Sequence, residues 1–268
     1  MKNHHVSRKA KVFSACFFLV IIGLWSTTIE AQEQYAYKYN VTSNGEDTLY
    51  YRCLQPDNLC SGKKYPLVLF LHGAGERGND NETQLKHGSG LFLNPVNREK
   101  FPAFVIFPQC PKKNFGPFIT EPSNFNGSSF PETFEMSPFI TQVKNLLDDY
   151  MSKPEVDNGR IYVIGLSMGG MGVYDMVCRF PDLFAAAVSI CGSVNVQRLP
   201  KAKKVCFRIF HGEKDMAVPV ECSRQAYEVL KRCGAKVEYI EFYGCDHLSW
   251  NPAFNFPDFM DWLFEQQK

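Results

Sequence analysis

The sequence predicts an α/β protein, with a mostly parallel central sheet and helices on both faces. Two observations predict this class: short, uninterrupted apolar runs recur along the chain, and stretches with apolar residues at helical spacing separate them. An uninterrupted apolar run is typical of a strand buried on both faces of a parallel sheet. The length of 268 residues, with neither an internal repeat nor a low-complexity linker after residue 32, favours a single domain over residues 32–268.

Six apolar runs are predicted as strands because their lengths suit strands better than helices. They are Pro66–Leu71, Phe104–Phe107, Arg160–Gly165, Ala185–Ile190, Val205–Phe210 and Val237–Phe242.

Four helices are predicted between and after these strands. Ser137 and Pro138 favour a helix start, with serine as the cap and proline at the first position. The other three helices are predicted over Ser167–Arg179, Pro219–Cys233 and Phe256–Gln266. Repeated alternation of strand and helix predicts a doubly wound sheet. Residues 112–136 have no periodicity, and a loop of that length is usually functional.

The overall composition excludes several classes of protein. Hydrophobic residues make up 45% and charged residues 21% of the chain, which is typical of a globular protein and excludes disorder and a coiled coil. The formal net charge is +1, so no broad electrostatic field favours a nucleic-acid partner or an anionic membrane surface.

The first thirty residues are typical of a secretory targeting segment. Met1–Lys11 holds four basic residues and no acidic one, and the 14 residues Val12–Trp25 are almost all apolar. That run is shorter than the about 20 residues that span a bilayer, and Ala31 offers a small residue for cleavage. We predict a signal peptide over residues 1–31, with an uncleaved anchor as the alternative. The mature protein is expected to be secreted, either extracellular or periplasmic.

Cysteine is abundant for a chain of this length. Removing the targeting segment leaves nine of the ten cysteines, and outside the cytosol some are expected to pair. Cys53 and Cys60 flank a short turn and form the candidate disulfide. Cys178 and Cys191 are predicted to be buried free thiols. The spacing contains no CxxC pair and predicts no metal site.

Gly165-Leu166-Ser167-Met168-Gly169 is the strongest chemical motif in the chain. This G-x-S-x-G lies between a predicted strand and a predicted helix, which is the setting of a nucleophile elbow. Glycines two residues on either side of the serine allow neighbouring chain segments to pass closely. The Ser167 hydroxyl is then presented at a helix N-terminus, where backbone N–H groups can stabilise an oxyanion.

A serine nucleophile needs a base and an acid, which follow it in the order acid and then histidine in this architecture. His247, in the loop after the last predicted strand, fits the base, whereas His211 precedes the candidate acid and is expected to shape its loop. Asp215 follows the strand that ends at Phe210 and is the candidate acid. Glu213 is the rival acid.

The second oxyanion donor is expected in the loop after the first buried strand. Ala74 lies in that loop, so its N–H and that of Met168 form the predicted oxyanion hole. His72 is expected to position the loop. Glu76 and Arg77 follow, and they either form an internal ion pair or contact substrate.

Five motifs in this order resemble the α/β-hydrolase superfamily. They are HGAGERG at 72–78, FPQCP at 107–111, RIYVIGLSMGG at 160–170, HGEKDMAVP at 211–219 and DHLSW at 246–250. Within it, residues 40–268 resemble secreted carboxylesterases grouped with feruloyl and acetylxylan esterases and with polyhydroxybutyrate-depolymerase-like proteins. The resemblance implies a triad of Ser167, Asp215 and His247. Trp250 matches an aromatic residue near the active-site rim of these relatives. With Gln109 of the second motif, it is the candidate substrate-binding residue.

Three functions stay open on this reasoning. The first is a serine esterase that forms an acyl-enzyme and acts on acyl or feruloyl esters of plant polysaccharide, without a cofactor or metal. The second is a serine peptidase of the prolyl-oligopeptidase type, for which the chain leaves little room for a gating domain. The third is a catalytically silent binding protein on the same fold. The favoured partner is a small-molecule or polysaccharide-linked ester, without stable membrane association after signal cleavage.

The phenylalanines of residues 112–136 also allow two interpretations. They form either a local cluster that pins the loop or an apolar wall for a ligand ring together with Trp250.

Overall fold

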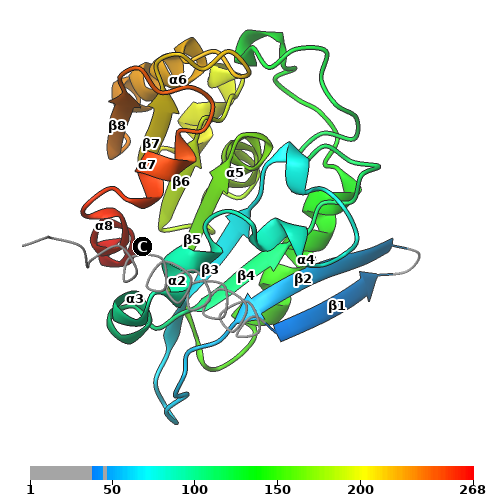
Figure 1. Cartoon of the computed structure of the whole chain (residues 1–268), viewed down its shortest axis with the longest axis vertical. Helices are drawn as coiled ribbons and strands as arrows, with labels where there is room; N and C mark the ends of the chain where they lie inside the picture. The colour runs from blue at the N-terminus through cyan, green and yellow to red at the C-terminus, as the bar shows by residue number, and fades with distance from the viewer. Residues whose placement is uncertain (1–37, 45–46) are drawn as a thin grey trace, which may run out of the picture. The chain divides into compact units, whose positions relative to one another are not determined.

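The computed structural model describes residues 38–44 and 47–268, which contain one eight-stranded sheet of order β1-β2-β4-β3-β5-β6-β7-β8 (Figure 1). The predicted signal peptide lies outside the described residues. The strands are β1 (Lys38–Asn44), β2 (Asp47–Leu54), β3 (Tyr65–Leu71), β4 (Phe104–Pro108), β5 (Val156–Leu166), β6 (Ala186–Ile190), β7 (Cys206–Gly212) and β8 (Val237–Phe242).

The sheet is mostly parallel, as predicted. Strands β3 to β8 pair in parallel with one another, whereas β1 pairs with β2, and β2 with β4, in the antiparallel sense. All six predicted strands are present. Strands β1 and β2 are not predicted from the sequence, because this hairpin at the sheet edge lacks the long apolar runs that mark doubly buried strands.

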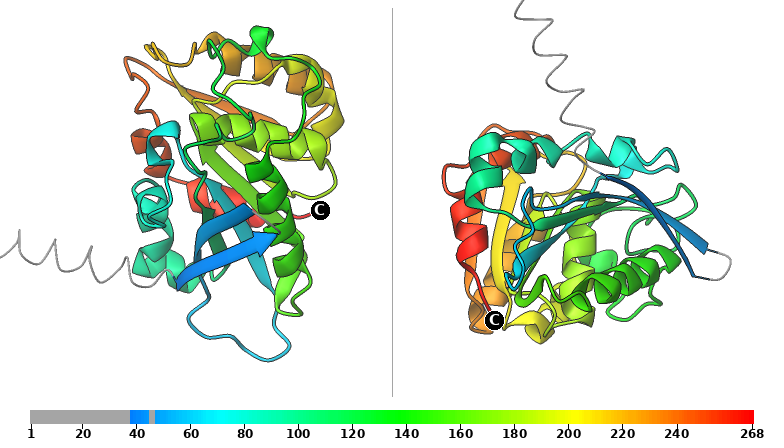
Figure 2. Two further views of the ribbon diagram at one scale, coloured as in Figure 1. Left: turned by 90° about the vertical axis from the view of Figure 1, so that its right-hand side faces the viewer. Right: turned by 90° about the horizontal axis from the view of Figure 1, so that it is seen from below.

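Helices cover both faces of the sheet (Figure 2). Along β3, Leu67, Leu69 and Leu71 pack toward α4, α5 and α6, whereas Val68 and Phe70 pack toward α2, α7 and α8. This alternation follows from the two-residue period of a strand and explains the uninterrupted apolar run. The helices are α2 (Ser89–Leu93), α3 (Pro95–Lys100), α4 (Pro138–Met151), α5 (Met168–Arg179), α6 (Glu221–Arg232), α7 (Trp250–Phe254) and α8 (Phe259–Glu265).

The four predicted helices correspond to α4, α5, α6 and α8. Helix α4 begins as expected, with Pro138 in its first turn and the Ser137 hydroxyl accepting a 3.2 Å hydrogen bond from the Ile140 N–H. Helices α2, α3 and α7 are not predicted from the sequence, because they have only five or six residues and so show no helical period. None of the helices in the described part of the chain combines the length and apolar character needed to cross a membrane.

The predicted disulfide between Cys53 and Cys60 is wrong, since no cysteine pair is bonded within residues 38–44 and 47–268. Cys53 lies on β2 opposite Ile106 and is 1% exposed. Cys60 lies on an exposed turn, where its thiol donates to the Asn58 carbonyl. The packing of Cys53 into the core turns its side chain away from that surface. Cys178 and Cys191 are buried free thiols, as predicted.

Candidate functional site

The candidate site lies at the carboxyl edge of the parallel strands. Ser167 follows β5, Asp215 follows β7, and His247 follows β8. Because these strands run parallel in one sheet, their carboxyl ends open onto the same edge, where the sites of open α/β sheets lie. Residues that are 80 positions apart in the chain are thereby brought together.

Ser167 sits on a strained turn between β5 and α5. Its φ of +53° and ψ of −118° lie outside the regions that an ordinary L-residue adopts. The turn is closed by close backbone approaches, because a Cβ on Gly169 would overlap the Leu71 carbonyl oxygen and one on Gly165 would overlap that of Gly169. The glycines of the G-x-S-x-G motif therefore permit the contacts that hold the serine at the helix N-terminus.

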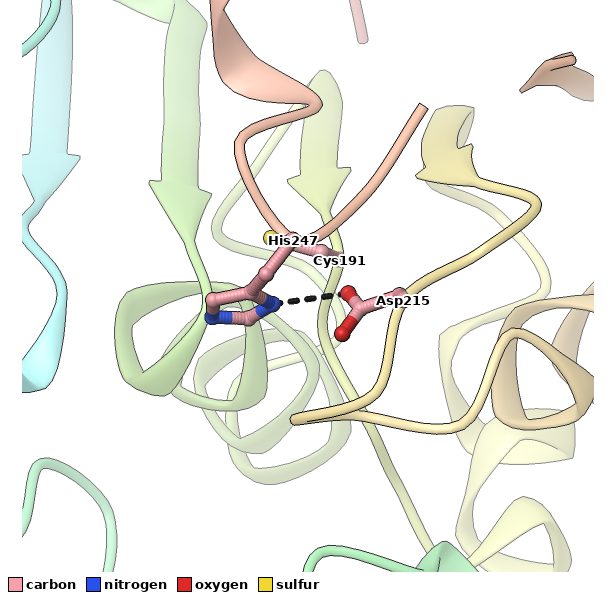
Figure 3. Close-up of side chains that lie close together, drawn as sticks. All are labelled: Cys191, Asp215 and His247. Atoms are coloured by element: carbon pink, nitrogen blue, oxygen red, sulfur yellow. Dashed lines mark hydrogen bonds and ion pairs between the residues drawn. The ribbon is translucent and has the colours of Figure 1, made fainter. Parts of the chain in front are cut away.

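A chain of two hydrogen bonds joins the three candidate triad residues. The Ser167 Oγ lies 2.9 Å from the His247 Nε2. The His247 Nδ1 lies 2.7 Å from the Asp215 Oδ2 (Figure 3). An ionised carboxylate only accepts hydrogen bonds, so Nδ1 carries the proton and Nε2 accepts from the serine hydroxyl. This tautomer leaves His247 able to take a proton from Ser167.

The Asp215 carboxylate accepts four hydrogen bonds inside the protein. One oxygen accepts from the N–H groups of Ala217 and Val218, both at 2.9 Å, and the other accepts from His247 and from His211 at 3.1 Å. Burial by itself would raise the pKa of Asp215, but these hydrogen bonds favour the charged form and hold its pKa below the ordinary value. The carboxylate therefore stays ionised at neutral pH.

His211 supports the acid and does not contact the serine. Its Nε2 lies 3.0 Å from the Val218 carbonyl oxygen as well as near Asp215, and both partners are acceptors, so this nitrogen carries the proton. Its Nδ1 then accepts from the Ser223 hydroxyl at 2.7 Å. The ring is fully buried. This geometry agrees with the expectation that His211 shapes the acid loop.

Glu213, the rival acid, points elsewhere. Its carboxylate accepts a 2.8 Å hydrogen bond from the Gly244 N–H. That contact ties the loop after β7 to the loop after β8 and leaves Asp215 as the carboxylate that meets His247.

The two predicted oxyanion donors lie on adjoining backbone segments. Met168 is the first residue of α5 and Ala74 is the first residue of a short 3-10 turn, so neither N–H has a partner from the preceding turn of its own helix. The start of α5 and the end of β3 touch at Gly169 and Leu71. Both segments therefore offer N–H groups beside the Ser167 turn.

His72 holds the loop that carries Ala74. Its Nε2 accepts from the Cys110 N–H at 2.9 Å, so its Nδ1 carries the proton and donates to the Gly73 carbonyl at 2.7 Å. The ring is 2% exposed, and burial lowers the pKa of His72 to about 4. A neutral His72 therefore joins the loop after β3 to the loop after β4.

The two candidate substrate-binding residues have different surroundings. The Trp250 ring packs against His247 at 5.4 Å and against His87 at 5.2 Å between ring centroids. Gln109 is 2% exposed, and its amide bonds to the Asn81 N–H, the Glu76 carbonyl and Asp80. These contacts use both ends of the amide and tie Gln109 to the loop after β3, and its role in substrate binding stays a prediction.

Glu76 and Arg77 do not pair with each other. The Glu76 carboxylate lies 3.7 Å from the His87 ring. Arg77 donates to the carbonyls of Ala74 at 3.0 Å and Asn114 at 3.2 Å, and lies 3.6 Å from the Glu121 carboxylate. Arg77 therefore links the candidate oxyanion loop to residues 112–136.

The phenylalanines of residues 112–136 pack on one another. Phe115 stacks on Phe125 at 5.6 Å, and Phe118 contacts Phe130 at 4.8 Å and Phe134 at 5.1 Å. All of these except Phe134 pack toward the sheet face covered by α4, α5 and α6, whereas Trp250 belongs to the cluster on the other face. The structure therefore favours the local cluster over an apolar wall shared with Trp250.

Two cavities accompany this loop. One of about 350 Å³ is lined by Phe118, Phe130 and Phe134. Another of about 740 Å³ lies by Phe134, Arg179 and Lys201. The second is at the C-terminal end of α5, a helix whose other end carries Ser167, so it is not part of the site around the triad.

One group of metal-ligating side chains occurs within the described ranges. The ligand atoms of Cys191, Asp215 and His247 all lie within 4.8 Å of one another (Figure 3). The sequence analysis treated Cys191 only as a buried thiol. Its position directly after β6 was the available signal, because that places it at the same sheet edge as the triad.

Comparisons with known proteins agree with this architecture. A family model described as phospholipase/carboxylesterase matches residues 60–258. Lysophospholipase-like protein 1 of Mus musculus is 24% identical over 200 residues, which are 70% of this chain and 82% of that protein. Poly(3-hydroxyalkanoate) depolymerase C of Paucimonas lemoignei is 28% identical over 127 residues, 47% of this chain and 28% of that protein.

Solved structures show the same fold. A thermostable esterase superposes with a TM-score of 0.80 at 34% identity, over 88% of this chain, which spans 64% of that esterase. A ferulic acid esterase superposes with a TM-score of 0.64 at 16% identity, over 85% of this chain and 97% of the other. The recognised superfamily and the predicted fold class are thereby confirmed.

Proposed function

We propose, since the chain belongs to the phospholipase/carboxylesterase family of α/β-hydrolases, that it is a serine esterase whose triad is Ser167, His247 and Asp215. The observation that carries this proposal is the unbroken pair of hydrogen bonds from the Ser167 Oγ through His247 to Asp215, at 2.9 and 2.7 Å. A nucleophile within reach of a base, with the base held by an acid, is the arrangement that acyl transfer requires.

The proposed reaction passes through an acyl-enzyme. His247 accepts the Ser167 proton as the serine oxygen attacks the ester carbonyl, and the N–H groups of Met168 and Ala74 stabilise the tetrahedral oxyanion. The alcohol leaves with the proton from His247. Water then attacks the acyl-serine by the same steps in the second half of the cycle. Asp215 stabilises the imidazolium and fixes its tautomer throughout.

The proposed substrates are acyl esters carried by small molecules or plant polysaccharide, with feruloyl esters as the specific candidate. This choice is supported by the resemblance of the five motifs to feruloyl and acetylxylan esterases and by a solved ferulic acid esterase of the same fold. Residues 1–31 support secretion, which would bring the enzyme to such polymers.

The test compares variants of the triad on an aryl acetate and on a feruloyl ester. Ser167→Ala is expected to lower kcat by about 10⁶ and to abolish labelling by a fluorophosphonate, with an unchanged circular dichroism spectrum. Asp215→Asn is expected to lower kcat by about 10⁴ through the wrong imidazole tautomer. Glu213→Gln, the matched control, is expected to keep most of the activity because its carboxylate contacts only the loop after β8.

Two results would reject the proposal. Ser167→Ala with activity within tenfold of wild type would remove Ser167 from the nucleophile role. A folded wild-type protein that cleaves peptide amides but no ester in a panel of acetyl, feruloyl and long-chain substrates would favour the peptidase.

A further inference from the structure

We propose that Cys191, Asp215 and His247 form an inhibitory binding site for a thiophilic divalent cation such as Zn²⁺ or Cd²⁺. These residues follow β6, β7 and β8, three adjacent parallel strands, so the sheet itself brings them together. Their ligand atoms lie within 4.8 Å of one another, with the Cys191 thiol beside the hydrogen-bonded pair of Asp215 and His247 (Figure 3). Spacing along the chain could not reveal the cluster, because its members are more than 20 residues apart.

Cys191 is held in an unusual backbone conformation. Its φ is +42°, in the left-handed region that residues with a Cβ rarely adopt, and its side chain is fully buried. Strain of this kind persists only where the surroundings impose it, and it concentrates at functional sites. This conformation places the Cys191 thiol at the sheet edge that carries the candidate triad, although the proposed hydrolysis does not use the thiol.

Ser249 gives a second, independent indication of a ligand. Its side chain is fully buried, and its Oγ makes no hydrogen bond of good geometry within the described residues. The same hydroxyl lies within hydrogen-bonding reach of the Cys191 thiol, and this contact lowers the pKa of the thiol against the larger, raising effect of burial. Buried polar atoms are nearly always satisfied, so a buried hydroxyl beside the thiol of the cluster is a candidate fourth ligand for a cation.

The donor set suits a soft or borderline cation. Zn²⁺ takes cysteine sulfur, histidine nitrogen and carboxylate oxygen at about 2.0–2.3 Å in a tetrahedral arrangement, which brings ligand atoms to about 3.5 Å from one another. The cluster reaches this separation by closing about 1 Å, while the 2.7 Å contact between Asp215 and His247 opens. One thiolate and one carboxylate neutralise the charge of the cation, so burial carries no penalty for net charge.

Binding breaks two bonds to hydrogen, forms one, and involves no oxidation or reduction. The S–H bond of Cys191 breaks and its proton leaves to solvent, while the His247 proton moves from Nδ1 to Nε2 as Nδ1 binds the cation. Nε2 then no longer accepts the Ser167 proton, so catalysis stops. This last consequence rests on the proposed function, whereas cation binding does not.

The experiment titrates the purified protein with CdCl₂. We expect one Cd²⁺ per chain bound through Cys191, a thiolate-to-metal absorption band, and loss of esterase activity that EDTA restores. Cys191→Ser is expected to keep esterase activity and to lose the part of the absorption band that comes from the Cys191 thiolate. It should also weaken inhibition by Cd²⁺ by at least about tenfold, since even residues that only orient a metal ligand contribute about that much to metal affinity. Cys191→Gly tests the same loss at a position where glycine relieves the strained φ.

Cys245→Ser is the matched control. The charge of Asp215 also helps to raise the pKa of this cysteine, but Cys245 lies outside the cluster, so inhibition is expected to persist in the variant. Equal inhibition and an equal band in wild type and both Cys191 variants would overturn the proposal, as would a wild type that binds no Cd²⁺. If no ester is cleaved at all, the band difference between wild type and Cys191→Ser still tests the cation site on its own.

Discussion

His72 makes the folded molecule sensitive to acid through one buried ring. Both of its nitrogens are used, one accepting from the Cys110 N–H and the other donating to the Gly73 carbonyl. Protonation would put a hydrogen on the nitrogen that accepts and a charge in the interior. The lowered pKa, about 4, therefore reports how strongly the fold depends on the neutral ring.

We expect His72 to contribute to acid destabilisation between pH 6.5 and 4. The ordinary pKa of histidine is about 6.5, so in this range the unfolded chain takes up a proton that the folded chain refuses, and stability falls as pH falls. The shift to about 4 corresponds to about 3 kcal/mol at most.

The measurement is urea unfolding of wild type and His72→Asn at several pH values. The variant is expected to be less stable at pH 7.5 but to lose less unfolding free energy between pH 6.5 and 4. The same pH slope in both proteins would contradict this assignment.

At this scale, the sequence predicts residues with a motif better than residues defined by packing. Ser167, Asp215 and His247 were found because strand ends and chain order identify them, and the structure brings them within hydrogen-bond distance. The Cys53 pairing is wrong, because the position of a core-facing thiol depends on neighbours that are remote in the chain. The partners of the buried Gln109 amide are remote in the same way, so the sequence could not predict them.

Among the elements, α5 lies against the end of β3 in close backbone contact. A side chain on Gly169 would overlap the Leu71 carbonyl oxygen, and backbone cannot move aside as a flexible side chain can. Gly75 lies in the 3-10 turn that begins at Ala74, and a Cβ there would meet nothing within 4 Å. Comparing alanine variants of these two glycines therefore separates the cost of steric overlap from the general effect of adding a methyl group.

We expect Gly169→Ala to destabilise the protein by at least about 3 kcal/mol, the upper part of the usual range for overpacking. At this chain length that lowers Tm by roughly 6–12 °C. Gly75→Ala is expected to change stability by less than about 0.5 kcal/mol. Scanning calorimetry checks both, and equal Tm values would show that α5 can shift away from β3.

The loop of residues 112–136 gives a prediction about specificity. Phe118 joins two other phenyl rings in the loop cluster, so Phe118→Ala should loosen the whole loop by about 1–3 kcal/mol. Since Arg77 links this loop to Ala74, kcat/KM is expected to fall by the same factor for acetyl and feruloyl esters. Ile119→Ala, at a residue 45% exposed on the same loop, is the control and should change neither value. Selective loss of feruloyl activity would instead place Phe118 against the acyl group.

At the scale of the whole molecule, one buried carboxylate joins three distant segments. Asp175 on α5 is 1% exposed and binds Arg179 at 2.8 Å and Arg198 of the 3-10 turn Val196–Ala202 at 2.6 Å. Arg179 also donates to the Phe134 carbonyl of the 112–136 loop at 3.0 Å. Removing the carboxylate would leave the guanidinium groups of Arg179 and Arg198 close together, largely buried and without their shared counter-charge.

We expect Asp175→Asn to cost about 3–5 kcal/mol, because breaking a buried pair leaves an uncompensated charge. The comparison is Asp182→Asn, whose pair with Lys204 at 3.0 Å is exposed on both sides and should contribute less than about 0.5 kcal/mol. Chemical denaturation of the two variants measures the difference. An Asp175→Asn protein as stable as Asp182→Asn would show that water reaches the cluster.

The order of the strands also places the proposed nucleophile and the proposed base on strands of different stability. Ser167 follows β5 in the middle of the sheet, whereas His247 follows β8, an edge strand that pairs only with β7. None of the residues of β8 is fully buried. Elements with few buried contacts, such as edge strands, unfold locally before the core strands do. Mild heating should therefore unfold β8 locally and move His247 away from Ser167, while β5 and the core stay folded. Esterase activity would then be lost reversibly at temperatures where most of the molecule is still folded.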